Sequence, residues 1–271
     1  MSKKMMPEPV KSLRLGKYKT ASNTQVRVYL LGDTLIDTGP PNKWDGLKKF
    51  IEEHRPSQVI LTHHHEDHAG NAAKISELTD ARIYISGGAE NPLAKGFSLR
   101  PYQHVVWGKP KNFSAKELPE EIFTSTGHRL LPIKTPGHSP DHTAFWEPDR
   151  KWLFSGDLYV GSKPRFLRKD EDLGMEMDTL RNLLKLDFEG LFCAHMGFFP
   201  DGRKRIEEKL LYLEDLVQKV QDFADLGLSV KQISDKIFKK ERLLPLITLG
   251  HFSQKNMVLA CLKTKVGRAN I

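Results

Sequence analysis

The chain has 271 residues, 39% hydrophobic and 28% charged, a balance typical of a globular protein with one sizeable core and an appended module. This composition excludes a disordered chain, and no apolar stretch is long enough to span a bilayer. The net charge of +8 favours anionic partners. Residues 1–9 are followed by no signal-like apolar run, and Cys193 and Cys261 are too few for a disulfide framework. We therefore expect a cytoplasmic protein with no membrane partner.

Hydrophobic patterning predicts strands and helices that interleave along the first two thirds of the chain. Apolar, β-branched runs predict strands at residues 26–31, 34–36, 59–61, 82–85, 130–133, 143–146 and 152–154. Helical patterns cover residues 43–54 and 177–186, and a shorter one covers 71–78. Interleaved strands and helices are typical of a layered α/β architecture.

A histidine-rich run follows the strand predicted at residues 59–61. His63, His65, Asp67 and His68 lie within six residues, between that strand and the helix that begins near residue 71. Neutral imidazole and carboxylate groups suit zinc, and also iron or manganese, whereas cysteines would have indicated a closed structural site. The spacing lets His63 and His65 point one way while Asp67 and His68 point to a neighbouring position. We therefore expect the run to contribute to two metal sites.

Three more candidate ligands follow, each at the end of a strand-like segment. His138 comes after a Pro-Gly turn, Asp157 after a short apolar strand and a glycine, and His195 after Leu191-Phe192-Cys193-Ala194. Any one of them alone would be read as an ordinary loop residue. Together with the histidine run they predict one open metal centre.

These residues resemble the signature of the metallo-β-lactamase superfamily, HxHxDH followed by a lone His, a lone Asp and a last His. The resemblance covers about the first two hundred residues and implies an αβ/βα four-layer sandwich with the metals at one edge of two packed sheets. It implies that His63, His65 and His138 hold one metal, that Asp67, His68 and His195 hold the other, and that Asp157 bridges them. The early motif Leu35-Ile36-Asp37-Thr38-Gly39 is also present, and Asp37 is implied to hold the histidine loop rather than to bind metal.

The expected chemistry follows from two divalent cations, for which zinc is the first choice and iron or manganese the alternatives. A shared water between ions about 3.5–4 Å apart has its pKa lowered to near 7, so hydroxide becomes available at neutral pH. The same ions polarise the bond under attack. Asp67 is the catalytic candidate, because a free oxygen of its carboxylate is expected to orient the hydroxide or to pass a proton to the leaving group.

After His195 the pattern becomes helical, which predicts a domain at residues 1–202 and a helical module at residues 203–271. One apolar stripe on a long helix that begins near Asp201 is formed by Ile206, Leu210, Leu213, Val217 and Val220. Ser229 is expected to cap a second helix, and residues 254–263 predict a third. The module resembles the winged-helix-like tail of a superfamily branch that includes lactamase-β-like endoribonucleases. It either caps the cleft or contacts nucleic acid.

Basic residues concentrate in two places. The first group follows Asp157 and is expected to line the cleft or to be solvated; it comprises Lys163, Arg165, Arg168 and Lys169. The second group lies in the helical module and comprises Lys231, Lys236, Lys239, Lys240 and Arg242.

Three functions remain open. The first is a glyoxalase II-like hydrolase that cleaves a thioester or ester of an anionic small molecule, although the C-terminal glutathione-binding pattern of that family is not found. The second is a metal-dependent endoribonuclease that cuts single-stranded RNA, although no inserted RNA-binding domain is found. The third is a non-enzymatic nucleic-acid-binding protein with structural metals, which seven candidate ligands at strand ends argue against.

Overall fold

The computed structural model describes residues 6–16, 25–88, 93, 96–239 and 243–264. The chain forms two compact units. The first comprises Met1–Thr135, Asp141–Val160 and Asp187–Gly202, and the second Pro136–Pro140, Gly161–Leu186 and Arg203–Ile271. The units share the break at residue 202 with the two predicted domains, and they differ from these domains over residues 136–140 and 161–186. The domain assignment itself stays a prediction.

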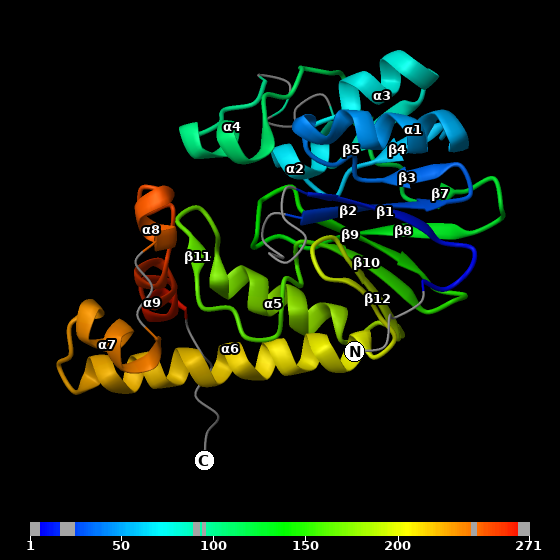
Figure 1. Cartoon of the computed structure of the whole chain (residues 1–271). Helices are drawn as coiled ribbons and strands as arrows, with labels where there is room; N and C mark the ends of the chain where they lie inside the picture. Colours follow the sequence, from blue (N-terminus) through cyan, green and yellow to red (C-terminus); the bar gives the residue numbers. More distant parts are fainter. Residues whose placement is uncertain (1–5, 17–24, 89–92, 94–95, 240–242, 265–271) are drawn as a thin grey trace. The chain divides into compact units, whose positions relative to one another are not determined.

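The first unit contains a sheet in which the strands follow chain order (Figure 1). Its strands are β1 (Lys11–Gly16), β2 (Gln25–Leu31), β3 (Thr34–Ile36), β4 (Gln58–Ile60), β5 (Arg82–Ile85) and β6 (Lys116–Glu117). The pairs β1·β2 and β2·β3 are antiparallel, and β3 to β6 run parallel. Parallel neighbours require crossover connections, and these carry the helices.

The helices of this unit lie in those crossovers. They are the 3-10 helix η2 (Pro41–Lys43), α1 (Trp44–His54), α2 (Glu66–Ala69), α3 (Ala72–Thr79) and α4 (Pro101–Trp107). Figure 1 shows α1 and α3 together on one side of the sheet. Leu47 and Ile51 of α1 and Ile75 of α3 are fully buried in a cluster with Leu35 and Val59 of the central strands. The apolar stripe of each helix thus covers this face of the sheet.

A second sheet has the order β13-β12-β10-β9-β8-β7. Its strands are β7 (Ile122–Phe123), β8 (Arg129–Lys134), β9 (Thr143–Glu147), β10 (Trp152–Gly156), β12 (Gly190–Cys193) and β13 (Gly197–Phe199). All neighbours are antiparallel except β10 and β12, which are parallel with a register shift between Phe154 and Gly156. A turn at Pro148-Asp149 joins β9 to β10, and Lys151 N donates there to Pro148 O.

Aromatic side chains from both sheets form a shared core. Tyr29 of β2 meets Phe154 of β10 and Phe192 of β12 edge-on, with ring centroids 5.7 and 5.5 Å apart. Its hydroxyl donates to Cys193 O at 2.6 Å, so the buried polar tip is satisfied. These contacts fix the two sheets face to face.

Several strands of the two sheets end at one edge of this core. The backbone there is joined by hydrogen bonds from Asp37 N to Ile60 O at 3.0 Å and from Thr143 N to Thr62 O at 2.8 Å. The first bond links the ends of β3 and β4, and the second links the segment after β4 to the start of β9. A third bond, from Ala194 N to Gly156 O at 3.3 Å, links the ends of β12 and β10, and Asp157 after β10 lies close to His63 and His68 after β4. The residues that follow these strands include most of the predicted ligands.

The second unit is mostly helical. Its elements are β11 (Leu167–Arg168), α5 (Leu173–Leu183), α6 (Gly202–Asp225), α7 (Val230–Ile237), α8 (Leu243–Ile247), β14 (Phe252–Ser253) and α9 (Gln254–Lys263). The predicted stripe of α6 is buried, from Ile206 to Val220. The Ser229 cap is confirmed, since its hydroxyl accepts from Gln232 N while Gln232 Oε1 accepts from Ser229 N. Among the described residues, no helix is both long and apolar enough to cross a membrane.

Candidate metal centre

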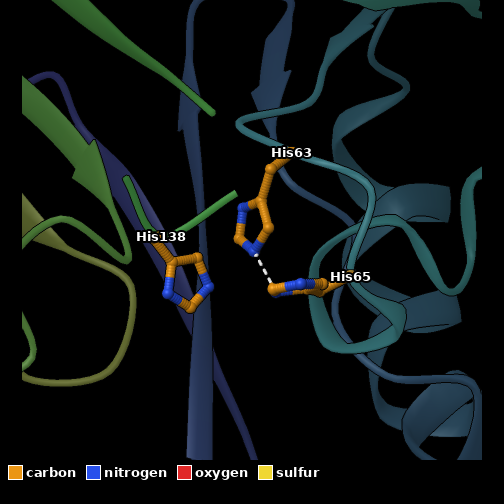
Figure 2. A group of neighbouring side chains, drawn as sticks. All are labelled: His63, His65 and His138. Atoms are coloured by element: carbon orange, nitrogen blue, oxygen red, sulfur yellow. Dashed lines mark hydrogen bonds between the residues drawn. The ribbon is translucent and has the colours of Figure 1, made fainter. Parts of the chain in front are cut away.

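The first group of predicted ligands comprises His63, His65 and His138. Each offers one ligand atom, and these atoms lie within 4.8 Å of one another. Figure 2 shows the three rings gathered around one space, with His63 Nε2 2.8 Å from His65 Nδ1. His138 lies on the loop Pro136–Pro140, whose flanks are joined by the hydrogen bond from Thr135 N to His142 O at 2.9 Å. The ligand atoms of the three residues are close enough together to bind one cation.

A second group comprises Asp67, His68 and His195, whose ligand atoms also lie within 4.8 Å of one another. His68 Nε2 and His195 Nε2 each lie 3.8 Å from Asp67 Oδ2. Asp157 Oδ1 lies 3.2 Å from His68 Nε2 and 3.0 Å from His195 Nε2. Asp157 also groups with His63 and His68 within the same limit, so its carboxylate reaches toward both groups.

Asp37 supports the histidine run through hydrogen bonds. Its carboxylate accepts from Thr62 N and from His68 Nδ1, both at 2.8 Å, and the hydroxyl of Thr62 lies 3.0 Å from both carboxylate oxygens. The bond to Nδ1 leaves His68 Nε2 to face Asp157. His195 is oriented in the same way, because its Nδ1 lies 2.5 Å from Gln25 O. Partners of this kind fix the tautomer and ring orientation of a metal-binding histidine.

The centre is electrostatically coupled. Burial lowers the pKa of His195, but the Asp157 and Asp67 carboxylates raise it more, to about 9. The pKa of His68 is also raised, because Asp157, Asp37 and Asp67 outweigh its burial. Burial raises the pKa of Asp157, yet His195 and His68 hold it well below its usual range. The carboxylates of this buried centre therefore favour positive charge beside them.

The donor set fits divalent cations. His68 Nε2 is buried and lies 3.2 Å from Asp157 Oδ1, but among the described residues it makes no hydrogen bond of acceptable geometry, although buried polar atoms are nearly always satisfied. Imidazole nitrogens and carboxylate oxygens, with no thiolate in either group, are ligands that zinc, iron and manganese accept. The residues present therefore fit a metal centre, and their roles as ligands stay a prediction.

Three residues beside the ligands have structural partners. His64, at the variable position of the motif, lies with Nδ1 2.7 Å from Asp141 Oδ1, so the pair joins the histidine run to the loop before β9. His142 is buried, and its Nε2 accepts from Asp157 N at 3.1 Å while its Nδ1 lies 2.7 Å from Thr135 Oγ1. His142 therefore positions the backbone of Asp157.

Sequence reasoning missed some supporting contacts. Glu171 Oε1 lies 2.7 Å from His138 Nδ1, although the two residues are far apart in sequence. Asn71 donates to three backbone carbonyls of the loop after β3, at Thr38, Gly39 and Pro40. A carboxylate or an amide carries no local signal that names a distant partner, so these contacts required the structure.

The expected basic residues near Asp157 are partly engaged. Arg168 is buried and its guanidinium pairs with Asp170 at 2.8 Å, whereas Lys163, Arg165 and Lys169 are exposed. Their role in lining a cleft stays a prediction. In the module, Lys231, Lys236 and Lys239 are exposed, and Lys240 and Arg242 lie outside the described residues.

Known proteins resemble this chain over the part that holds the predicted ligands. A family model described as the metallo-beta-lactamase superfamily matches residues 22–195. The lactamase-like protein aptB of Emericella nidulans is 28% identical over 200 residues, which cover 71% of this chain and 58% of that protein. The hydroxyacylglutathione hydrolase of Bdellovibrio bacteriovorus is 30% identical over 141 residues, which cover 51% of this chain and 48% of that protein. The chain spans about half the length of the curated relatives it matches.

A solved structure shares the fold over nearly the whole chain. The metallo-beta-lactamase family protein TTHA1429 of Thermus thermophilus superposes with a TM-score of 0.66 at 20% identity, covering 94% of this chain and 92% of that one. At this identity the likeness speaks for the fold alone, and the predicted fold class is confirmed. With a family model that matches most of its length, the chain belongs to the metallo-β-lactamase superfamily.

Proposed function

We propose that the protein is a dinuclear metal-dependent hydrolase that cleaves a thioester or ester bond of an anionic small molecule. The observation that carries this proposal is the convergence of the two ligand groups at one edge of the sheets, with Asp157 reaching toward both. Zinc is the first choice of metal, with iron or manganese as alternatives. Two such cations supply a nucleophile from water at neutral pH and polarise the bond under attack.

The residues of the chain have distinct parts in this proposal. Asp37 and Gln25 O hold the rings of His68 and His195, so their Nε2 atoms stay directed at the centre. Asp67 Oδ2 lies 3.8 Å from both of these Nε2 atoms, which places a carboxylate oxygen beside both rings of the second group. From there Asp67 can accept a proton from water and return it to the leaving group.

The substrate class is inferred from charge and from one relative. A net charge of +8 favours an anionic substrate. The relative from Bdellovibrio bacteriovorus is named a hydroxyacylglutathione hydrolase, and a hydroxyacylglutathione is a thioester of an anionic peptide. Both observations support a thioester or ester with an acidic portion.

A second candidate is a metal-dependent endoribonuclease that acts on single-stranded RNA. It is favoured by the exposed cations Lys231, Lys236 and Lys239 on and beside α7. Lysines of this kind neutralise phosphates without reading sequence. The same lysines are also compatible with a solvated surface, so the small-molecule activity is the first proposal.

One experiment separates the candidates. The metal-replete protein is incubated with a panel of anionic acyl thioesters and esters, with thiol release followed by a colour reagent, and separately with labelled single-stranded RNA. Asp157→Asn, purified identically, excludes contaminating enzymes, and Asp149→Asn in the exposed β9–β10 turn is the matched control. We expect thioester hydrolysis that Asp157→Asn abolishes and Asp149→Asn preserves. Cleavage of RNA alone, lost in Asp157→Asn, would favour the nuclease, and inactivity toward both would contradict the proposal.

A further inference from the structure

The loop that carries His138 is seated on the segment leading into α5. Gly137 O accepts from Asp172 N at 2.8 Å, and Pro136 O accepts from the Thr179 hydroxyl at 2.8 Å. A Cβ atom on Gly137 would lie 2.6 Å from Glu176 Cα, so the loop and the helix touch through their backbones. The position of the loop is therefore set by residues that follow Asp157 in the chain.

One side chain of this segment contacts the imidazole itself. Glu171 Oε1 lies 2.7 Å from His138 Nδ1, and the two side chains are only 10% and 11% exposed. The other oxygen of Glu171 accepts from Arg168 N at 2.9 Å, so the carboxylate is held at both oxygens. Arg168 is in turn fixed by pairing of β11 with β14 and by its ion pair with Asp170. Glu171 thus presents a fixed acceptor to one nitrogen of His138.

We propose that Glu171 is a positioning residue that selects the ring nitrogen with which His138 binds metal. Glu171 accepts a hydrogen bond from Nδ1–H of His138. This bond keeps His138 in the tautomer in which Nε2 carries the lone pair, and this nitrogen is directed toward His63 and His65. A carboxylate partner also makes the imidazole a stronger ligand. The inference rests on the proposed function to the extent that a cation binds at this group.

The arrangement differs from the support of the other ligands. His68 is oriented by Asp37, and His195 by Gln25 O, and both partners belong to the first sheet or its end. Glu171 belongs to the second unit, together with the His138 loop. The segment Gly161–Leu186 contains none of the predicted ligands. Through Glu171 it nevertheless has a part in metal binding.

The test compares three variants by metal affinity, measured in competition with a chromogenic chelator. Glu171→Leu removes the acceptor at similar size, Glu171→Gln keeps an acceptor but removes the charge, and Asp178→Asn changes an exposed carboxylate of α5, the helix that follows Glu171, as a control. We expect Glu171→Leu to weaken one of two binding steps by about 10-fold to 100-fold. The second step should remain near the wild-type value. Glu171→Gln should recover part of the loss, and Asp178→Asn should change neither step.

A measurement on the unaltered protein covers the case in which Glu171→Leu does not fold. Long-range 1H–15N correlation spectra of the zinc-loaded chain report which nitrogen of each imidazole carries hydrogen, and His138→Gln assigns the signal. We expect His138 to be protonated at Nδ1 and coordinated through Nε2. Coordination through Nδ1, or unchanged binding of both metals in a folded Glu171→Leu protein, would overturn the inference. A wild-type protein that binds no metal would instead contradict the proposed function itself.

Discussion

At the residue scale, Asp37 shows how one side chain can serve both the fold and the site. It adopts a left-handed backbone conformation, with φ of 61°, and is buried. Asp and Asn tolerate this region better than most residues do. The conformation turns the carboxylate back toward Thr62 and His68, where it satisfies a backbone N–H and a ring N–H together. The tautomer of His68 therefore depends on the charge of Asp37.

Asp37→Asn tests this dependence. The amide of the variant presents N–H toward His68 Nδ1, which favours the tautomer with hydrogen on Nε2, where a metal should bind. We expect metal affinity to fall about 10-fold to 100-fold, as for other partners of ligating histidines. Asp33→Asn is the control. Asp33 also supports a turn, because its carboxylate accepts hydrogen bonds from Ser57 and Ser125, but this turn lies away from the predicted ligands. Isothermal titration with zinc should show the loss only in Asp37→Asn; equal affinities would contradict the account.

The raised pKa of His195 predicts how the stability of the metal-free protein changes with pH. The imidazole pKa is near 6.5 in the unfolded chain and about 9 in the fold. Its proton therefore stabilises the fold fully below pH 6.5, and this contribution is lost as pH rises to about 9. Urea unfolding in the presence of chelator should show a falling free energy of unfolding across this window.

The same experiment has two controls. His195→Gln should flatten the fall, and His104→Gln, at an exposed position of α4, should not. Zinc should reverse the trend, because ligands must lose protons before they bind metal. An unchanged pH dependence in metal-free His195→Gln would show that His195 is not the group responsible.

At the element scale, the site depends on how strands end. β10 ends at Gly156, which has φ of 48° and lies against His142 and Thr62. A Cβ there would lie 2.7 Å from His142 Nε2 and 2.9 Å from Thr62 Cβ. Because Asp157 follows directly, this tight approach places its carboxylate among the histidines.

Gly156→Ala should therefore damage the site as well as the fold. Gly127, in the turn between β7 and β8, has φ of 82° but no atom within 4 Å of its virtual Cβ, so Gly127→Ala is a matched control. We expect the control to cost about 1–2 kcal/mol from backbone strain alone. Gly156→Ala should cost more and should also lower the bound metal per chain, measured by plasma mass spectrometry. Equal costs and equal metal content would show that the close contact does not matter.

The sequence predicted the elements whose patterns are local. Helix α9 was expected at residues 254–263 and has those bounds, and β3 and β5 also agree. Strand β1 was missed, because its residues Lys11–Gly16 mix charged and apolar side chains, and its partner β2 supplies the pairing. Helix α8 was missed as well, since it is short and contains Pro245.

In the site, too, some features are visible in the sequence and others depend on the three-dimensional structure. The motif and the strand ends are visible in the sequence, and in the structure the predicted ligands lie close together, while their roles as ligands stay a prediction. It did not reveal the contact of Glu171 with His138 or the pairing of His64 with Asp141, since both join residues distant in sequence. Such pairs depend on tertiary packing, which no local pattern encodes.

At the scale of the whole molecule, we expect bound cations to complete a buried, charged centre. His68 and His195 share Asp157 in the first unit, and His138 is held by Glu171 in the second. A ligand that binds only the folded state stabilises it by about 2.7 kcal/mol at one hundred times its dissociation constant. Occupied sites should therefore stabilise the fold strongly.

Removal of metal should lower the melting temperature. For a chain of this size we expect a difference of about 5–10 °C per site at such saturation, from the usual 2–4 °C per kcal/mol. Differential scanning fluorimetry of the chelator-treated and zinc-replete protein measures it. His63→Gln should reduce the shift, whereas a shift of equal size in that variant would place the binding elsewhere.

The most direct test of the central claim is anomalous diffraction from crystals of the zinc-replete protein, recorded on both sides of the zinc absorption edge. We expect two anomalous peaks about 3.5–4 Å apart, as in other two-metal hydrolytic sites. One peak should lie among His63, His65 and His138, the other among Asp67, His68 and His195, with Asp157 in contact with both. A single peak, or peaks only at histidines outside these groups, would contradict the claim of a dinuclear centre.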